Sequence, residues 1–160
     1  MVNFAITPII TYAMCTLKLP FGVLDNIDRA RKQRLWRGND ISRKGGNLAT
    51  WPMVSAPKPK GGLGVINLRL QNDALLLKHW YKFYNKEDIP WVHLIWDRYY
   101  TNKIPHAARE VGSIWWNDVL RLSSLYRTIS RCTLGDGSTV LFWDDNWSGV
   151  ILAENYSELL

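Results

Sequence analysis

Hydrophobic and polar residues alternate along most of this chain with the period of an α-helix, and this pattern predicts a mainly α fold. We expect a bundle-like helical lobe, a basic loop rich in glycine and proline, and a small C-terminal β-hairpin. Asp88 and Ser113 stand where helix N-caps are expected, and Pro90 suits a first helical turn. The expected helices are residues 1–19, 23–36, 67–85, a segment from Pro90 through Tyr99, and a segment after Ser113 through Ile129.

The segment 67–85 has the broadest apolar arc, and such an arc indicates burial between other helices. We predict one apolar stripe, widened by three further residues. The stripe is Leu70, Ala74, Leu77, Tyr81 and Tyr84, and the widening residues are Leu76, Trp80 and Phe83.

The segment 23–36 has a less regular apolar side. Arg31 and Arg34 intrude on it, so we expect each of them either to extend its charged end toward water or to turn toward a bound anion. The apolar positions of that side are Val23, Leu24, Ile27, Ala30 and Leu35.

Two stretches do not follow the helical period. Residues 37–64 are rich in glycine and proline, and "PKPKGGLG" lacks both the Walker spacing and the dinucleotide pattern, so we predict a shaped turn with exposed lysines. In "RCTLGDGSTVLFWDDNW", two β-prone runs flank the turn residues Gly135 to Ser138, which is typical of a hairpin. We therefore divide the chain into residues 1–64, 65–130 and 131–160.

Composition limits the classes of site. The chain has 160 residues, enough for one ordinary domain or two small lobes, and 47% of them are hydrophobic. Neither the two cysteines nor the three histidines have metal-ligand spacing, so we predict no metal and no cofactor, and reduced thiols in an intracellular protein. Residues 1–19 are too short and too polar to span a bilayer, and we expect no membrane partner.

The charge is concentrated. Residues 29–60 contain nine Lys/Arg and one Asp, a net charge of +8, within a chain whose net charge is +6. A cluster of this sign suits a polyanion such as nucleic acid, although a solvated helix face or a nuclear-import signal has the same composition. Trp36 and Trp51 lie among these cations; they could stack on bases, but we expect them in the core.

The motif "FWDDNW" at residues 142–147 resembles the tetrad in which reverse transcriptases hold magnesium. Two adjacent aspartates share a metal only on a tight turn that faces another carboxylate. Asp144 and Asp145 instead follow the second β-prone run, and we predict no catalytic residue. A nuclease that uses Asp136, Asp144 and Asp145 is a remaining alternative.

Several stretches in order resemble the region behind the polymerase core of plant LINE-type (non-LTR) retrotransposon reverse transcriptases. They are "TYAMCTLKLP", a basic helix ending in "LWRG", "LATWPMVSAPKPKGGLGVINLRLQNDALLLKHWYKFYN", "SIWWNDVL" and "LGDGSTVLFWDDNW". The resemblance implies a thumb remnant and a connector, separated from the palm aspartates upstream and from a zinc-binding module downstream. It also implies that "FWDDNW" belongs to the connector.

Thumbs hold a primer–template duplex by its backbone without reading bases, and this role agrees with the charge cluster. We therefore expect a non-catalytic, nuclear, nucleic-acid-binding segment of an RNA-directed DNA polymerase, with the missing polymerase core as a second partner. A structural connector or degenerate element without activity is the alternative. The predicted nucleic-acid-binding residues are Arg29, Lys32, Arg37, Arg43, Lys44, Lys58 and Lys60.

Overall fold

The structure is a computed structural model that describes residues 7–38, 48–100, 112–137 and 140–159. Its residues divide into two compact units, residues 1–76 (unit 1) and residues 77–160 (unit 2). The division falls within helix α5 (Leu68–Tyr84). The three-part division expected from the sequence stays a prediction.

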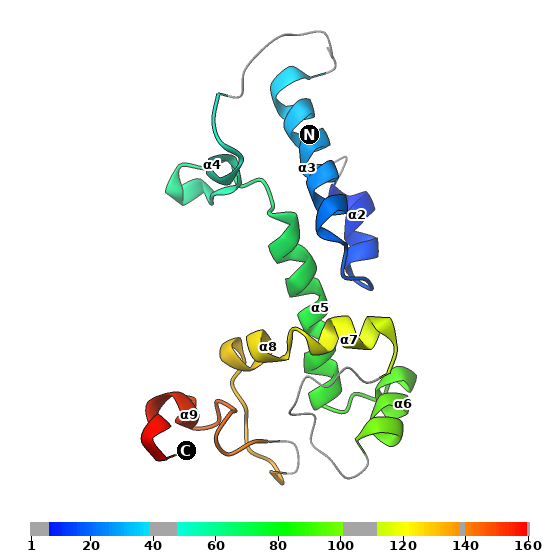
Figure 1. Ribbon diagram of the computed structural model, residues 1–160, viewed down its shortest axis with the longest axis vertical. Coiled ribbons are helices and arrows are strands. Elements are labelled where there is room, and N and C mark those ends of the chain that lie inside the picture. The colour runs from blue at the N-terminus through cyan, green and yellow to red at the C-terminus, as the bar shows by residue number, and fades with distance from the viewer. Residues whose placement is uncertain (1–6, 39–47, 101–111, 138–139, 160) are drawn as a thin grey trace. The chain divides into compact units, whose positions relative to one another are not determined.

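The described elements are all helical, which confirms the mainly α class (Figure 1). Unit 1 contains α2 to α4, the short 3-10 helix η1 and the start of α5, and unit 2 contains the rest. The bounds are α2 Thr7–Met14, α3 Phe21–Arg37, α4 Trp51–Ser55, η1 Lys58–Lys60, α5 Leu68–Tyr84, α6 Pro90–Tyr99, α7 Ile114–Leu120, α8 Ser123–Ile129, α9 Leu152–Asn155 and η2 Ser157–Leu159.

Unit 1 has a core in which three helices meet. Met14 of α2, Leu24 of α3 and Leu68 of α5 are buried against one another. Burial of such side chains is the main favourable contribution to folding. The partly buried residues packed on this core are Ile10, Leu19, Ile27 and Leu75.

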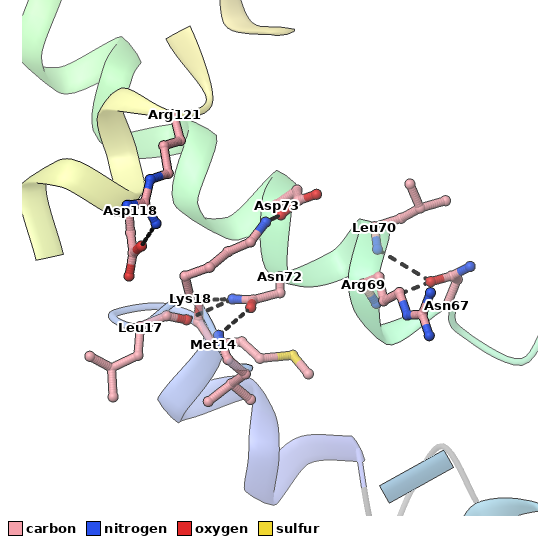
Figure 2. A network of polar contacts seen from close by, with 11 residues as sticks. Met14, Leu17, Lys18, Asn67, Arg69, Leu70, Asn72, Asp73, Asp118 and Arg121 are labelled. Carbon is pink, nitrogen blue, oxygen red and sulfur yellow. Dashed lines mark hydrogen bonds and ion pairs between the residues drawn. The ribbon is translucent and has the colours of Figure 1, made fainter. Parts of the chain in front are cut away.

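Buried Asn72 of α5 holds the break after α2 in place (Figure 2). Its amide Nδ2 donates to the carbonyl oxygens of Met14 (3.0 Å) and Leu17 (2.8 Å), and its Oδ1 accepts from the amide of Leu19 (2.8 Å). Beside it, Lys18 forms an ion pair with Asp73. Asn72 thus satisfies backbone groups at the end of α2 that the helix itself leaves unpaired.

The buried face of α5 differs from the stripe expected from the sequence. Leu68, Asn72, Leu76, Trp80 and Phe83 are buried, whereas Leu70 and Tyr81 are 68% and 60% exposed. The predicted stripe was therefore wrong in register, and its widening residues are the core. Polar Asn72 obscured the pattern because it occupies a core position in which backbone groups satisfy its amide.

Unit 2 is built around aromatic side chains. Trp80 and Trp116 are buried with ring centroids 5.4 Å apart, and Phe83 stacks on Trp96 with centroids 4.6 Å apart. The indole nitrogen of Trp80 donates to the carbonyl of Val119 at 2.7 Å, and that of Trp96 donates to the carbonyl of Phe83 at 2.9 Å. Large rings whose polar atoms are paired form a well-defined core.

Of the two helix N-caps expected in unit 2, Ser113 is confirmed and Asp88 is wrong. Ser113 caps α7, since its hydroxyl accepts from the amide of Trp116 at 3.2 Å. Asp88 does not cap α6; the N-cap is Ile89, and the Asp88 carboxylate contacts His93 at 2.9 Å. The helix expected after Ser113 is interrupted at residues 121–122 and forms α7 and α8.

The predicted C-terminal β-hairpin is wrong, because no strand occurs in the parts of residues 131–160 that the structure describes. Among the described residues, the amide of Cys132 in the first run donates to the carbonyl of Asn146, which follows the second run (2.9 Å). The Asp145 side chain accepts from the amide of Leu141 at 2.8 Å, and the amide of Asp145 donates to the carbonyl of Leu141 at 3.1 Å. This local turn uses backbone groups of Leu141 and Asp145 that a β-ladder would need for its hydrogen bonds. Ser138 lies outside the described residues.

Within the described ranges, every helix is too short or too polar to be a candidate for crossing a bilayer. Neither Cys15 nor Cys132 forms a disulfide, and both side chains are half-buried.

Candidate nucleic-acid interface

Helix α3 separates its cations from its core face. Arg29 and Arg37 are exposed and Lys32 is half-buried, whereas Leu24 is buried. With 3.6 residues per turn, Arg29, Lys32 and Trp36 fall on one side of α3 and Leu24 and Arg31 on another, with Lys32 at the border between the two sides. The exposed cations Arg29 and Arg37 therefore lie away from the buried positions of α3.

Arg31 is the exception among the cations of α3, because it is fully buried. Its guanidinium donates to the carboxylate of Asp28 at 2.7 Å and to the carbonyl of Ile66 at 2.8 Å. The expectation that Arg31 would extend to water or turn toward a bound anion is wrong, because an acid of its own helix neutralises it. Arg34, the other intruding arginine, is exposed.

The same Asp28 fixes Trp51 at the start of α4. The indole nitrogen of Trp51 donates to the second carboxylate oxygen of Asp28 at 3.1 Å. Arg31 and Lys32 lie 5.5 Å and 5.4 Å from the Trp51 ring centroid, both within cation–π distance. Lys32 is thus held above a ring. Trp36 and Trp51 are half-buried, so the expectation of core tryptophans is met only in part.

Lys58 and Lys60 are exposed on the short helix η1. Two backbone hydrogen bonds hold the turn that contains these lysines. The amides of Leu63 and Gly64 donate to the carbonyls of Val54 and Ala56 at 3.1 Å and 3.0 Å. Gly61 has φ of +81°, a left-handed conformation that glycine adopts without strain. The expectation of a shaped turn with two exposed lysines is confirmed.

Five of the seven predicted nucleic-acid-binding residues can be placed in unit 1, and Arg43 and Lys44 lie outside the described residues. Contacts bring Lys32 and Trp51 together. Among the residues that the structure describes, no ion pair involves Arg29, Arg37, Lys58 or Lys60. Arg34 is also exposed and belongs to the same group of cations. The list of predicted binding residues omits it because the helical period puts it on the apolar side of residues 23–36. The high density of positive charge in this segment was the signal that could have included it.

The aspartates of "FWDDNW" have different surroundings. Asp145 is buried, accepts from the amide of Leu141 and lies 3.4 Å from the Arg127 guanidinium, whereas Asp144 is exposed. The described residues contain no cluster of three potential metal ligands. The contacts of Asp145 give it a structural role in closing the turn.

Unit 2 contains a cavity of about 600 Å³ where the end of α5 faces α8 and the chain that follows. Burial raises the pKa of the Tyr126 phenol to about 12, and burial also raises the pKa values of Tyr84 and of the Cys132 thiol. These groups therefore stay protonated at neutral pH. The residues that line the cavity include Tyr84, Tyr126, Arg127, Arg131, Cys132 and Asp145. No motif in the sequence indicates this cavity.

The chain is similar to a plant protein over most of its length. The chain is 28% identical over 149 residues to a protein of Arabidopsis thaliana named "Putative ribonuclease H protein". The match covers 89% of this chain and 24% of that protein, so the chain spans about a quarter of the length of its relative. No family model and no solved structure matches. The chain is thus similar to a plant protein, while reverse transcriptase, LINE element and thumb stay predictions.

Proposed function

We propose that this chain is a non-catalytic segment of a plant retrotransposon reverse transcriptase that holds nucleic acid by its sugar-phosphate backbone. The cations of α3 and the lysines of η1 contact phosphates, and bases are not read. The chemistry of polymerisation belongs to another part of the parent protein, and the proposal includes a nuclear location, where such an element meets its target DNA.

The observation that supports this proposal most is a set of solvent-exposed cations in unit 1. Arg29, Arg37, Lys58 and Lys60 are exposed, and no acid among the described residues neutralises them. The one fully buried cation of α3, Arg31, has its own acid. Unpaired cations on fixed elements attract phosphates through counterion release. The name of the plant relative is that of a ribonuclease, an enzyme class whose substrate is a nucleic acid.

The test is the salt dependence of binding to an RNA–DNA hybrid. We expect the logarithm of Kd to rise linearly with the logarithm of salt concentration, and two hybrids of different sequence to bind equally well. A variant with Arg29→Gln, Arg37→Gln, Lys58→Gln and Lys60→Gln should bind more weakly. For this variant, the slope of log Kd against log salt concentration should be lower by about one for each phosphate contact removed.

The control is a variant with Lys78→Gln and Arg98→Gln, two exposed cations of α5 and α6 in unit 2. This control should bind as the unchanged chain does. A Kd that stays constant between low and high salt would refute the proposal, as would equal weakening by the control variant. Polymerase or magnesium-dependent nuclease activity of the chain would refute its non-catalytic part.

The alternative is a structural connector, and one observation favours it. Ile9 and Tyr12 of α2 are 79% and 82% exposed, and Phe21 at the start of α3 is 60% exposed. Apolar side chains left open in this way can be a docking surface for another part of a longer protein. Strong binding of a hydrophobic dye, together with no measurable affinity for the hybrid, would favour the connector.

A further inference from the structure

The cavity of unit 2 has the size and lining of a small-ligand site. Its volume of about 600 Å³ lies inside the range of natural ligand pockets, roughly 300–1,000 Å³. It lies within a single unit, so its walls do not depend on how the two units are arranged. Natural pockets combine apolar and aromatic walls with a few polar groups, and this cavity has both.

The aromatic wall consists of Tyr84 and Tyr126. Their rings are nearly parallel, with an interplanar angle of 9° and centroids 5.7 Å apart. Trp80 stacks against both, at 5.3 Å from Tyr84 and 6.1 Å from Tyr126, and it is fully buried. The wall is therefore backed by a buried ring. Both phenols are uncharged at neutral pH, as ordinary tyrosines are, so the rings do not repel an anion.

The cavity also has an excess of positive charge. Arg127 lies 3.4 Å from Asp145 and donates to the Tyr84 hydroxyl at 3.5 Å, so its charge is largely compensated. Arg131 is exposed at the same cavity, and no ion pair involves it in the part of the chain that the structure describes. One guanidinium is therefore available to an anionic ligand, beside aromatic rings and the polar side chains of Asn85 and Ser130.

We propose that this cavity binds one nucleotide of single-stranded nucleic acid, an inference that rests on the proposed function of the chain. The base packs against Tyr84 and Tyr126, and the phosphate pairs with Arg131. Aromatic rings beside cations are the usual combination in sites that accept single strands without sequence preference. The cavity would then retain an unpaired nucleotide, while the cations of unit 1 hold the duplex.

Cys132 lines the cavity and provides a direct readout. The probe is adenosine 5′-monophosphate, added to the full chain during alkylation by iodoacetamide, with the modified peptides quantified by mass spectrometry. We expect the nucleotide to slow alkylation of Cys132 in proportion to its occupancy. Cys15, the other half-buried thiol, belongs to unit 1 and should react at an unchanged rate.

The matched variants are Arg131→Gln and Arg98→Gln, which each remove one exposed arginine of unit 2. Arg98 lies on α6 and does not line the cavity. We expect Arg131→Gln to weaken protection of Cys132 by about tenfold, the loss typical of one charge-assisted hydrogen bond. We expect Arg98→Gln to leave it unchanged.

Three outcomes would overturn this inference. They are no protection of Cys132 by adenosine 5′-monophosphate, equal protection by inorganic phosphate alone, and equal weakening by Arg98→Gln. Inorganic phosphate tests whether the base contributes. Failure here is distinguishable from failure of the proposed function, because salt-dependent binding of hybrid by unit 1 does not require the cavity of unit 2.

Discussion

Single polar residues in core positions do much to define unit 1. Asn72 and Arg31 are both buried, and both stand where the helical period places an apolar side chain. Each has several partners: Asn72 has three backbone groups, and Arg31 has Asp28, the carbonyl of Ile66 and the ring of Trp51. Because the partners come from different elements, these residues specify how the elements meet.

Replacing Arg31 tests this role. Arg31→Met leaves the Asp28 carboxylate and the Ile66 carbonyl without their guanidinium, and removing one partner of a buried pair destabilises by about 3–5 kcal/mol. We expect faster hydrogen exchange in peptides of α3 and α4, measured by mass spectrometry. Arg29→Met is the control, since Arg29 is exposed and surface changes stay within about 0.5 kcal/mol. Equal exchange in the two variants would contradict the role assigned to Arg31.

At the level of secondary-structure elements, the turn between α4 and α5 matters most for the proposed interface, because η1 lies in it. Its backbone returns close to α4, and a Cβ atom added at Gly62 would lie 2.0 Å from the carbonyl oxygen of Ala56. No side chain fits at that distance, so the backbone must move. The positions of Lys58 and Lys60 therefore depend on Gly62, although this residue contributes no charge to the interface.

Gly62→Ala should open this turn. We expect it to destabilise the turn by about 2 kcal/mol or more, since the contact is with backbone and cannot be relieved by a rotamer change. The readouts are hydrogen exchange of peptides that span residues 54–65 and the affinity for an RNA–DNA hybrid, which should fall. Gly22→Ala is the matched control. A Cβ atom at Gly22 of α3 meets nothing within 4 Å, and alanine should stabilise this helix slightly. A Gly62→Ala variant as stable as the unchanged chain would contradict the close approach.

Across the whole molecule, the two units differ in chemistry. Unit 1 holds eleven Lys/Arg against four Asp/Glu, a net charge of +7, whereas unit 2 holds nine against ten, a net charge of −1. Seven of the nine tryptophans belong to unit 2. Three tyrosines of unit 2, Tyr84, Tyr100 and Tyr126, have pKa values raised mainly by burial.

This difference predicts how stability responds to alkaline pH. The Tyr126 phenol has a pKa of about 12 in the folded chain and about 10 when unfolded, so the folded state binds more protons between these values. Its contribution to stability is fully present below about pH 10 and is lost as pH rises toward 12. We expect the free energy of urea unfolding, followed by tryptophan fluorescence, to decrease over this range.

The control for this prediction is Tyr126→Phe, which removes the titrating hydroxyl and retains the ring beside Trp80. Its unfolding free energy should decrease less steeply between pH 10 and pH 12 than that of the unchanged chain. Because most tryptophans belong to unit 2, the fluorescence reports chiefly on that unit. If the unfolding free energy fell equally steeply with pH in the unchanged chain and in Tyr126→Phe, Tyr126 would ionise at the same pH in the folded and unfolded states.

Local and additive properties could be derived from the order of amino acids alone. Net charge is a sum over residues, so the basic character of residues 29–60 holds in any fold. Helix formation depends on neighbours within a turn or two, and the mainly α class and the Ser113 cap were predicted on that basis. The exposed lysines of the turn followed from glycine and proline, whose backbone preferences are also local.

Properties that depend on distant partners required the folded chain. The register of α5 is set by what packs opposite it, and the backbone groups that satisfy Asn72 lie more than 50 positions earlier. Arg31 is buried because Ile66 and Trp51 approach it, and the expected hairpin is absent because Asp145 bonds Leu141 within its own turn. The cavity beside Tyr126 joins α5, α8 and the chain after α8. Such contacts arise only when the chain closes on itself, since no property of one segment determines which other segment it will meet.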